Sequence, residues 1–372
     1  MCASSIVSDC VFESPRPRGN GPLLVGLVPG EGVGPELTAI AREVLGAVES
    51  RSDARFTLEL GGAIGADAVR AGGPALNDDA VAFFGGVFAR GGAILSGPGG
   101  HRFVYDLRRR FDLYCKVSPI TVDEELLGVS RLRPELVRDL DLLVVRDNAG
   151  GVYQGRWEAG ADPSGQRYAE HAFGYRENEV RRIVEVGARL AVRRTGQLRV
   201  VAKHGGVPTI TDLWQDITRE GAARHGLDAR VVDVDLAAYQ LLHDPRAFDV
   251  VVCPNMVGDI LGDLLAVALG SRGLSYSGNF MADGGAVYQT NHGSAFDLVG
   301  RDCANPVAHL YALAMLLADS FGLEAEAGWI RAAVKSVWRA GFKTADIAGP
   351  GDNVVGTREL GARIADAVGR GA

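Results

Sequence analysis

Two aspartates interrupt an otherwise apolar segment, NMVGDILGDLLA, at residues 255–266. Asp259 and Asp263 are four residues apart, so a helix places both carboxylates on one face. Among leucines these charges repel each other and lose hydration, and a hard divalent cation such as Mg²⁺ or Mn²⁺ relieves both penalties through oxygen ligands. The competing interpretation is an ordinary first helical turn whose acids favour the helix dipole.

The composition excludes several classes of protein. The chain has 372 residues, enough for about two domains, and 47% of its residues are apolar. The formal net charge is −7 with no basic block, which argues against nucleic acid or an anionic membrane as a partner. No uninterrupted apolar run reaches the roughly 18 residues of a membrane span. The five scattered cysteines fit a reducing cytoplasm without a zinc site, so we expect a cytoplasmic protein.

The order of the apolar segments predicts an α/β fold. Residues 1–21 lack the apolar stretch of a secretory signal, and we expect them to be a mobile tail. Beyond them, short apolar strands alternate with helices, which predicts a mostly parallel sheet covered by helices. The expected strands are 23–28, 93–96, 142–145, 198–202, 230–234 and 250–253, and the expected helices are 37–48, 177–194, 211–225, 237–242 and 307–321.

Two details refine this prediction. The turn after the first strand reads G-x-G-x-G at Gly30, Gly32 and Gly34. This is not the G-x-G-x-x-G fingerprint, so we do not expect a Rossmann fold. Residues 156–173 are polar and lack helical periodicity, and such a long irregular insertion is often functional, for example as an arm to a partner subunit.

Several separated segments, taken in order, resemble one enzyme family. They are PGEGVGPE near the start, LRRRFDLY (107–114), VVRDNAGGVYQG (144–155), Lys203 at the end of a strand, VDLAAYQLL from Val234, NMVGDILGD, and NHGSAFDLVGRDCANP (291–306). In order and spacing they resemble the β-decarboxylating dehydrogenases, which include isopropylmalate, isocitrate and homoisocitrate dehydrogenases. The resemblance runs from about Leu23 to the C-terminus.

The resemblance implies an isopropylmalate-dehydrogenase-like fold, in which two α/β domains share a mixed, mostly parallel sheet. Residues 22–113 and 270–372 would form the cofactor-binding domain. Residues 114–269 would form the central domain, with a dimer arm at about 156–173. Because residues of the central domain would serve the neighbouring subunit's site, the resemblance implies a homodimer with shared active sites.

The family's chemistry assigns roles to the acidic and proton-transferring residues. NAD oxidises the hydroxyl of a 3-substituted malate, and the resulting β-keto acid loses CO₂ while Mg²⁺ or Mn²⁺ acts as a Lewis acid. By resemblance the metal ligands are Asp259 and Asp263, with Asp235 from the other subunit. Lys203 would accept the hydroxyl proton, with a pKa lowered by burial and the metal, and Tyr153 would protonate the enol carbon. The competing interpretations are a strand-end cap for Asp235, a surface amine for Lys203 and a packed aromatic for Tyr153.

Other residues match the family's ligands for substrate and cofactor. Arg108 and Arg146 would bind substrate carboxylates, which a guanidinium fork fits well. His292 and Asn305 would hold adenine, and the backbone of Gly293, Ser294 and Ala295 would meet the phosphates. Asp297 would select NAD, because a carboxylate accepts hydrogen bonds from the ribose diol and repels a 2′-phosphate.

The departures from the family pattern lie at the substrate end. Ser118 replaces an arginine, while Lys116, two residues earlier, lies on the same face of a strand and can restore the charge. Gly205 and Gln289 also depart from the pattern. The segment DNAGG (147–151) lacks the acidic residue of the family's NTEG segment. The segment that determines substrate specificity in the family reads RFVY here (102–105). It has neither the apolar pattern expected for an isopropyl group nor the Ser/Asn pattern of isocitrate enzymes.

We therefore expect a substrate other than standard isopropylmalate, namely a 2-hydroxy di- or tricarboxylate or a phosphonate analogue, with Arg102 or Lys116 meeting an anionic C3 substituent. Two alternatives remain. One is a hydroxy-acid dehydrogenase of the tartrate or malate type. The other is a non-catalytic regulatory subunit of a hetero-oligomeric dehydrogenase, although such a subunit would be expected to lose some of the residues that this chain retains.

Overall fold

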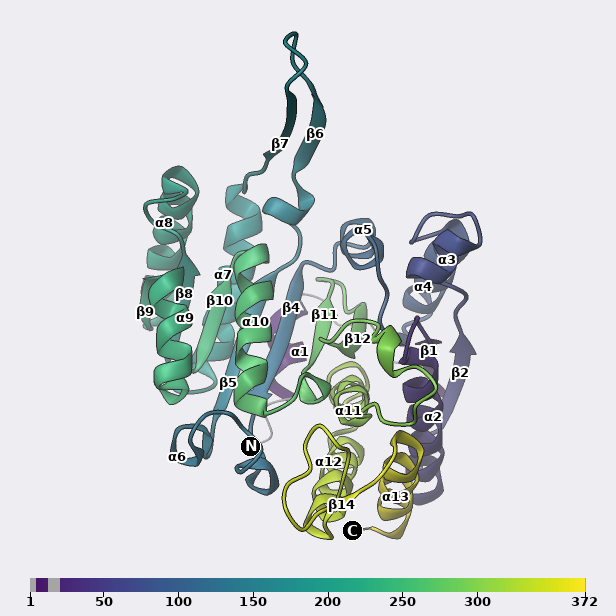
Figure 1. Cartoon of the computed structure of the whole chain (residues 1–372). Coiled ribbons are helices and arrows are strands. Elements are labelled where there is room, and N and C mark those ends of the chain that lie inside the picture. The colour runs from purple at the N-terminus through teal and green to yellow at the C-terminus, as the bar shows by residue number, and fades with distance from the viewer. Residues whose placement is uncertain (1–4, 13–20, 372) are drawn as a thin grey trace.

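A ten-stranded sheet runs through the whole molecule (Figure 1). The computed structural model describes residues 5–12 and 21–371. The strand order is β2-β1-β3-β12-β11-β4-β5-β10-β8-β9, and only β12–β11, β11–β4 and β4–β5 are antiparallel pairs. The prediction of a mostly parallel, mixed α/β sheet is confirmed. The strands are β1 (Leu23–Val28), β2 (Phe56–Leu60), β3 (Ala93–Ser96), β4 (Cys115–Thr121), β5 (Asp141–Asp147), β8 (Gln197–Ala202), β9 (Asp228–Asp233), β10 (Val250–Cys253), β11 (Tyr276–Phe280) and β12 (Ala286–Thr290).

The two ends of the sheet come from different parts of the chain. Strands β1, β2, β3 and β12 belong to its first and last parts, whereas β4, β5, β8, β9 and β10 belong to residues 115–253. The two groups meet where β11 pairs with β4, for example at Asn279 and Lys116. This arrangement is compatible with the expected domain boundaries, which stay a prediction.

Helices cover both faces of the sheet. Figure 1 shows α10 in front of the middle strands and α7 behind them. Helix α11 packs on β3, β11 and β12 and is buried along nearly its whole length, because its sequence is apolar all round. The longer helices are α2 (Gly34–Arg51), α4 (Asp78–Ala89), α7 (Glu177–Val192), α8 (Pro208–His225), α9 (Val234–His243), α10 (Asn255–Leu269), α11 (Val307–Phe321), α12 (Glu324–Arg339) and α13 (Thr357–Arg370); the shorter ones are α3 (Gly65–Arg70), α5 (Phe103–Arg110) and α6 (Pro134–Val137).

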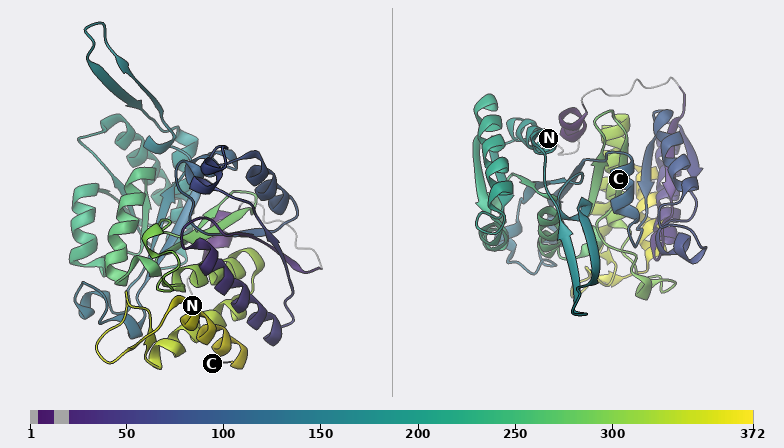
Figure 2. Two further views of the ribbon diagram at one scale, coloured as in Figure 1. Left: turned by 45° about the vertical axis from the view of Figure 1, so that its right-hand side comes forward. Right: turned by 90° about the horizontal axis from the view of Figure 1, so that it is seen from above.

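The expected arm is a regular hairpin rather than an irregular insertion. Strands β6 (Arg156–Ala161) and β7 (Arg167–Ala172) pair antiparallel and project far from the body (Figures 1 and 2). Every residue of both strands is exposed. A strand with solvent on both faces has no need of alternating apolar side chains, so its sequence lacks the usual strand pattern. A second small pair joins β13 (Phe342–Lys343) to β14 (Asn353–Val354).

Part of the expected mobile tail is folded. Helix α1 (Ser5–Val11) packs against α7 and α11 and buries Val7, Cys10 and Val11. Their i, i+3, i+4 spacing gives one apolar face to an otherwise polar segment. The tail prediction is therefore wrong for residues 5–11, while residues 1–4 and 13–20 lie outside the described residues. Over the described ranges, no helix is both long and apolar enough to span a membrane.

Docking of α1 predicts a measurable contribution to stability. Val11 is fully buried, so Val11→Ala should lower the free energy of unfolding by about 1–3 kcal/mol in urea denaturation at fixed protein concentration. Val354→Ala removes the same methyl groups from a valine that is 62% exposed, and should change it by less than about 0.5 kcal/mol. Equal effects of the two substitutions would show that α1 does not dock in solution.

Candidate active site

Arg146 anchors the start of α10 at the carboxyl end of β5. Its side chain is buried; Nε and Nη2 donate to Oδ1 of Asn255 at 3.1 and 2.8 Å, and Nη1 pairs with Asp259. Asn255 in turn donates to the carbonyl of Gly150 at 2.8 Å. A Cβ at Gly258 would lie 2.8 Å from Cβ of Arg146, so only glycine permits this close approach. The orientation of Asp259 is thereby fixed.

Tyr153 and Asp259 form a donor–acceptor pair. Oη of Tyr153 donates to Oδ2 of Asp259 at 2.9 Å. Burial and the neighbouring carboxylate raise the pKa of Tyr153 to about 12. Burial opposes ionisation of Asp259, but Arg146 and then Lys116 outweigh it and hold the pKa of that carboxyl below its ordinary value. At neutral pH the phenol therefore keeps its proton beside an ionised carboxylate.

Arg108 and Lys116 are buried cations on the same side of the sheet. Arg108 lies in the last turn of α5, and Lys116 is the cross-strand partner of Arg146 on β4 and β5. Burial, followed by the charge of Arg146, lowers the pKa of Arg108 to about 9 and the pKa of Lys116 well below its ordinary value. The charges of Arg146 and Asp259 act on both of these side chains, so the four groups lie close together.

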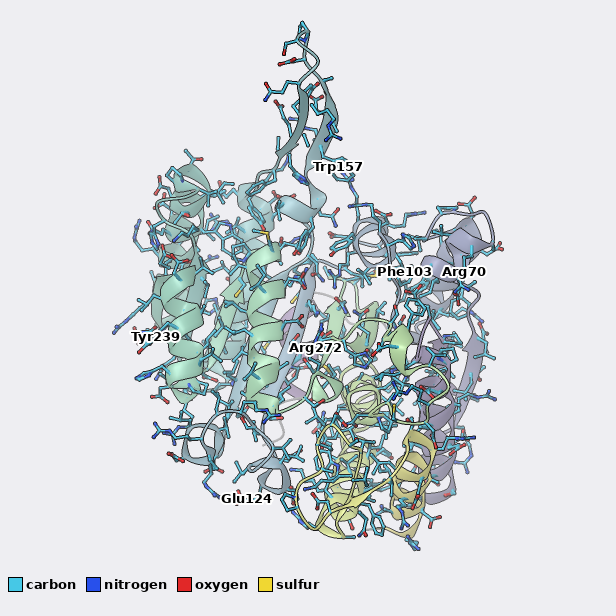
Figure 3. All side chains as sticks on the ribbon, viewed as in Figure 1. Arg70, Phe103, Glu124, Trp157, Tyr239 and Arg272 are labelled. Atoms are coloured by element: carbon cyan, nitrogen blue, oxygen red, sulfur yellow. The ribbon has the colours of Figure 1, made fainter. Side chains whose placement is uncertain are left out.

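Asp263 lies one helical turn beyond Asp259 and is half exposed. Its Oδ2 accepts a hydrogen bond from Nη2 of Arg272 at 2.9 Å. Arg272, labelled in Figure 3, also lines the cavity that contains most of the predicted cofactor residues. The acidic face of α10 and that cavity are therefore neighbours.

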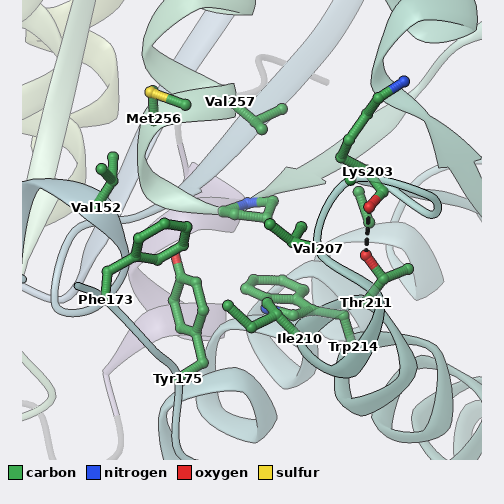
Figure 4. A pocket seen from close by; sticks show the side chains of 13 residues that line it. Val152, Phe173, Tyr175, Lys203, Val207, Ile210, Thr211, Trp214, Met256 and Val257 are labelled. Atoms are coloured by element: carbon green, nitrogen blue, oxygen red, sulfur yellow. Dashed lines mark hydrogen bonds between the residues drawn. The ribbon is translucent and has the colours of Figure 1, made fainter. Parts of the chain in front are cut away.

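Lys203 and Asp235 form a separate group. Nζ of Lys203 donates to Asp233 at 3.0 Å and pairs with Asp235. These contacts raise the pKa of Lys203, so the expectation of a lowered pKa is wrong for the chain by itself, where the amine is half exposed and ion-paired. In Figure 4 its side chain extends away from the apolar pocket beside it, which Phe173, Tyr175 and Trp214 help to line. Within the described residues, no three His, Cys, Asp or Glu side chains converge, so the three predicted metal ligands do not meet in one chain.

A cavity of about 420 Å³ gathers the predicted cofactor residues. It is lined by His292, Gly293, Ala295, Asp297 and Asn305, among others. Partial burial lowers the pKa of His292, so the ring is neutral at neutral pH. The site of cofactor binding stays a prediction, and a cavity of this size with an acidic group and exposed loop backbone is suited to part of a dinucleotide.

Ser294 is directed away from this cavity, and it reveals a residue that the sequence reasoning missed. Its hydroxyl donates to the buried carboxylate of Glu31, which also accepts from the backbone N–H of Ala66. Gly32 has φ +61°, and an added Cβ would collide with the carbonyl oxygen of Ser294. The Gly-rich turn thus supports the cofactor loop directly. The sequence signal for this role was the position of Glu31 between Gly30 and Gly32 in the turn.

Asp346 was also missed. It accepts hydrogen bonds from Nδ2 of Asn305 at 3.1 Å and from the hydroxyl of Ser271, so it positions two walls of the cavity. Its surroundings in the sequence carry no motif, and only the fold reveals this role.

Arg102 lies further out than Arg108. Its guanidinium lies 4.6 Å from the ring centroid of Trp157 and contacts Asp106 at 3.3 Å. Trp157 lies at the base of the arm (Figure 3). The ring of Tyr105, on the same helix, lies between Arg102 and Tyr153, with its centroid 5.1 Å from that of Tyr153. Arg102 therefore connects α5 to the arm, and its role in substrate binding stays a prediction.

An acidic helix face beside a cavity of this size is compatible with a dehydrogenase, in which a dinucleotide must lie beside the reacting group. Residues 24–364 match the model of the isocitrate/isopropylmalate dehydrogenase family. The chain belongs to this family and is a dehydrogenase, as the sequence motifs predicted.

Individual relatives agree with this assignment. The chain is 34% identical over 358 residues to a 3-isopropylmalate dehydrogenase of Geobacillus kaustophilus, covering 92% of this chain and 95% of the relative. It is 35% identical to that of Desulfitobacterium hafniense, covering 91% and 97%. The crystal structure of isocitrate dehydrogenase from Methylococcus capsulatus superposes with a TM-score of 0.83 at 28% identity, covering 93% of this chain and 99% of that one.

The position of Glu31 predicts a loss of stability when it is removed. Glu31→Ala leaves the Ser294 hydroxyl and the Ala66 N–H without their acceptor, and should lower the free energy of unfolding by about 1–3 kcal/mol. Glu43→Ala, at an exposed position of α2, should leave it within about 0.5 kcal/mol. Urea denaturation compares the two variants, and indistinguishable curves would contradict the role assigned to Glu31.

Proposed function

We propose that this protein catalyses the NAD- and Mg²⁺- or Mn²⁺-dependent oxidative decarboxylation of a 3-substituted malate, as a homodimer whose subunits share their active sites. The observation that carries the proposal is the separation of two half-sites in one chain. Tyr153, Asp259 and Asp263 lie on one side, while Lys203 and Asp235 contact each other elsewhere. A second copy of the chain can supply the missing half to each site.

The acidic residues fit a divalent cation. Asp259 and Asp263 are partly exposed on one face of α10, and Arg146 and Lys116 keep the pKa of Asp259 low, so an ionised oxygen ligand is available. These two would hold the metal together with Asp235 of a second copy. When bound, the ion supplies a Lewis acid that favours ionisation of a substrate hydroxyl.

The remaining groups bind the substrate and move its protons. Arg108 presents a buried fork to a carboxylate. Tyr153, whose phenol keeps its proton, donates it to carbon after CO₂ leaves. Lys203 accepts the hydroxyl proton, which requires the partner's site to relieve the ion pair that it makes in its own chain.

The surface of α9 and α10 supports dimer formation. Five large apolar side chains on these helices are between 38% and 62% exposed: Leu236, Tyr239, Met256, Ile260 and Val267. Tyr239 points outward from α9 in Figure 3. Single exposed apolar residues are ordinary, but a group on two adjacent helices indicates an interface. The arm offers further surface to the same partner.

The loop around the cavity would hold NAD. His292, neutral at neutral pH, and Asn305 would contact adenine, and Asp297 would accept hydrogen bonds from the ribose diol. When bound, NAD accepts the hydride from the substrate carbon. Measuring CO₂ together with NADH separates this proposal from a hydroxy-acid dehydrogenase that does not decarboxylate, and the absence of both products with every substrate would favour a regulatory subunit.

Subunit complementation tests the shared site. Asp259→Asn and Lys203→Met should each abolish Mn²⁺-dependent formation of NADH and CO₂. Co-expressed in equal amounts, they should recover about a quarter of wild-type activity, because half of the dimers are mixed and one of their two sites is intact.

The matched control pairs two substitutions from the same half-site. Co-expressed Asp259→Asn and Tyr153→Phe should recover no more activity than each alone, because neither arrangement restores an intact site. Recovery in this control, or none in the first pair, would contradict a site shared between subunits.

Asp297 predicts the choice of nucleotide. Asp297→Ser removes the charge that repels a 2′-phosphate, so the ratio of kcat/KM for NAD over NADP should fall about tenfold or more. Asp302→Ser, in the same loop but outside the cavity lining, serves as the control and should leave the ratio unchanged. An unaltered ratio in the Asp297 variant would remove Asp297 from the ribose site.

A further inference from the structure

Two buried cations in the candidate site have no anion of their own. Arg108 and Lys116 are 6% and 8% exposed. Within the part of the chain that the structure describes, no hydrogen bond or ion pair reaches either side chain. A buried charge without a partner is costly, and chains retain it chiefly where a ligand supplies the missing partner. The two cations therefore indicate an anionic ligand.

The third cation of the group is already used within the protein. All three nitrogens of the Arg146 guanidinium contact Asn255 or Asp259. Arg146 thus holds α10 in place and shapes the floor of the site. Arg108 and Lys116 are the cations of this group that have no partner among the described residues.

Lys116 is placed where a ligand of this site would meet it. It lies directly across from Arg146 on the neighbouring strand, and the charges of Arg108, Asp259 and Asp263 all act on it. Ser118, two residues along β4, is instead tied to Nδ2 of Asn291 at 3.4 Å. The positive charge of this strand therefore lies opposite Arg146 and about 6.6 Å along β4 from position 118.

We propose that Lys116 is a specificity-determining residue that binds an acidic group, carboxylate or phosphonate, carried by the C3 substituent of the substrate. This rests on the proposed function. A malate core has two carboxylates. The one next to the hydroxyl would bind the divalent cation that Asp259 and Asp263 hold, and the guanidinium of Arg108 matches the other. Lys116 is then left for a third acidic group. Arg102 is not needed for it, because that guanidinium stacks on Trp157 and contacts Asp106.

Tyr105 places its ring within 6.0 Å of the Arg108 guanidinium and against Tyr153, so the neighbouring wall is an aromatic ring with a hydroxyl group. An isopropyl group would leave the ammonium of Lys116 buried without a partner, whereas an acidic group would pair with it.

The test compares three malates that differ only at C3, with isopropyl, 2-carboxyethyl or phosphonomethyl as the substituent. Lys116→Met keeps an unbranched side chain that is one atom shorter and removes the amine. It should lower kcat/KM for at least one acidic substrate by about 10- to 100-fold and change that for isopropylmalate by less than about threefold. Comparison of the two acidic substrates identifies which group Lys116 binds. Lys116→Arg should retain most of the preference. Lys335→Met, at a partly exposed lysine of α12 that pairs with Asp123, should keep the wild-type preference among the three malates.

Thermal unfolding adds a readout that needs no turnover. Without ligand, Lys116→Met should unfold at a higher temperature than wild type, because the cost of burying an amine without a partner is gone. The preferred acidic malate should raise the unfolding temperature of wild type and not that of Lys116→Met. An equal loss of kcat/KM with all three malates would place Lys116 on the malate core and overturn the inference, as would an unchanged preference.

These outcomes are separate from those of the proposed function. If wild type oxidises isopropylmalate and Lys116→Met leaves its selectivity unaltered, the inference fails and the proposed function stands. If wild type turns over none of the three malates but an acidic one stabilises it through Lys116, the proposed function fails and the anion site stands.

Discussion

The contact between Arg146 and the first turn of α10 is the constraint on which the site depends. One buried guanidinium holds Asn255 and Asp259 at once, and Gly258 lets the helix lie against it without a side chain between. Because bonds to a guanidinium fork are directional, this contact sets both the rotation of α10 and its position along β5. The rotation in turn decides which carboxylates face the site.

The charges around this contact are balanced within the protein only in part. Asp259 and Asp263 each have an arginine partner, whereas Arg108 and Lys116 have none among the described residues. In the second group of residues, Lys203 has two carboxylate neighbours, Asp233 and Asp235. Such imbalances reduce the stability of the free chain and are typical of sites that a ligand or a second subunit completes.

The sequence predicted the elements with the clearest apolar patterns well. The expected strands 23–28 and 250–253 coincide with β1 and β10, because uninterrupted apolar runs rich in Val and Leu are typical of strands buried on both faces. Helix α9 begins three residues earlier than expected, since the side chain of Asp233 caps it as β9 ends. The arm and α1 were misjudged because a solvated hairpin lacks alternation and a seven-residue helix shows barely two turns of its pattern.

The residues of the candidate site divide in the same way. The sequence by itself determined which groups are candidates for the proposed chemistry, since Asp259, Asp263, Tyr153, Arg146 and the loop at 291–306 are recognisable from residue type and spacing. The tertiary structure alone decided which side chains meet. Glu31 contacts Ser294 from 263 residues away, and Asn305 donates to Asp346. Within one chain Lys203 pairs with Asp235, which raises the pKa of the lysine. The reason is physical, because spacing along the chain governs contacts within one helix or strand, whereas hydrogen-bond partners, burial and pKa values depend on segments that only folding brings together.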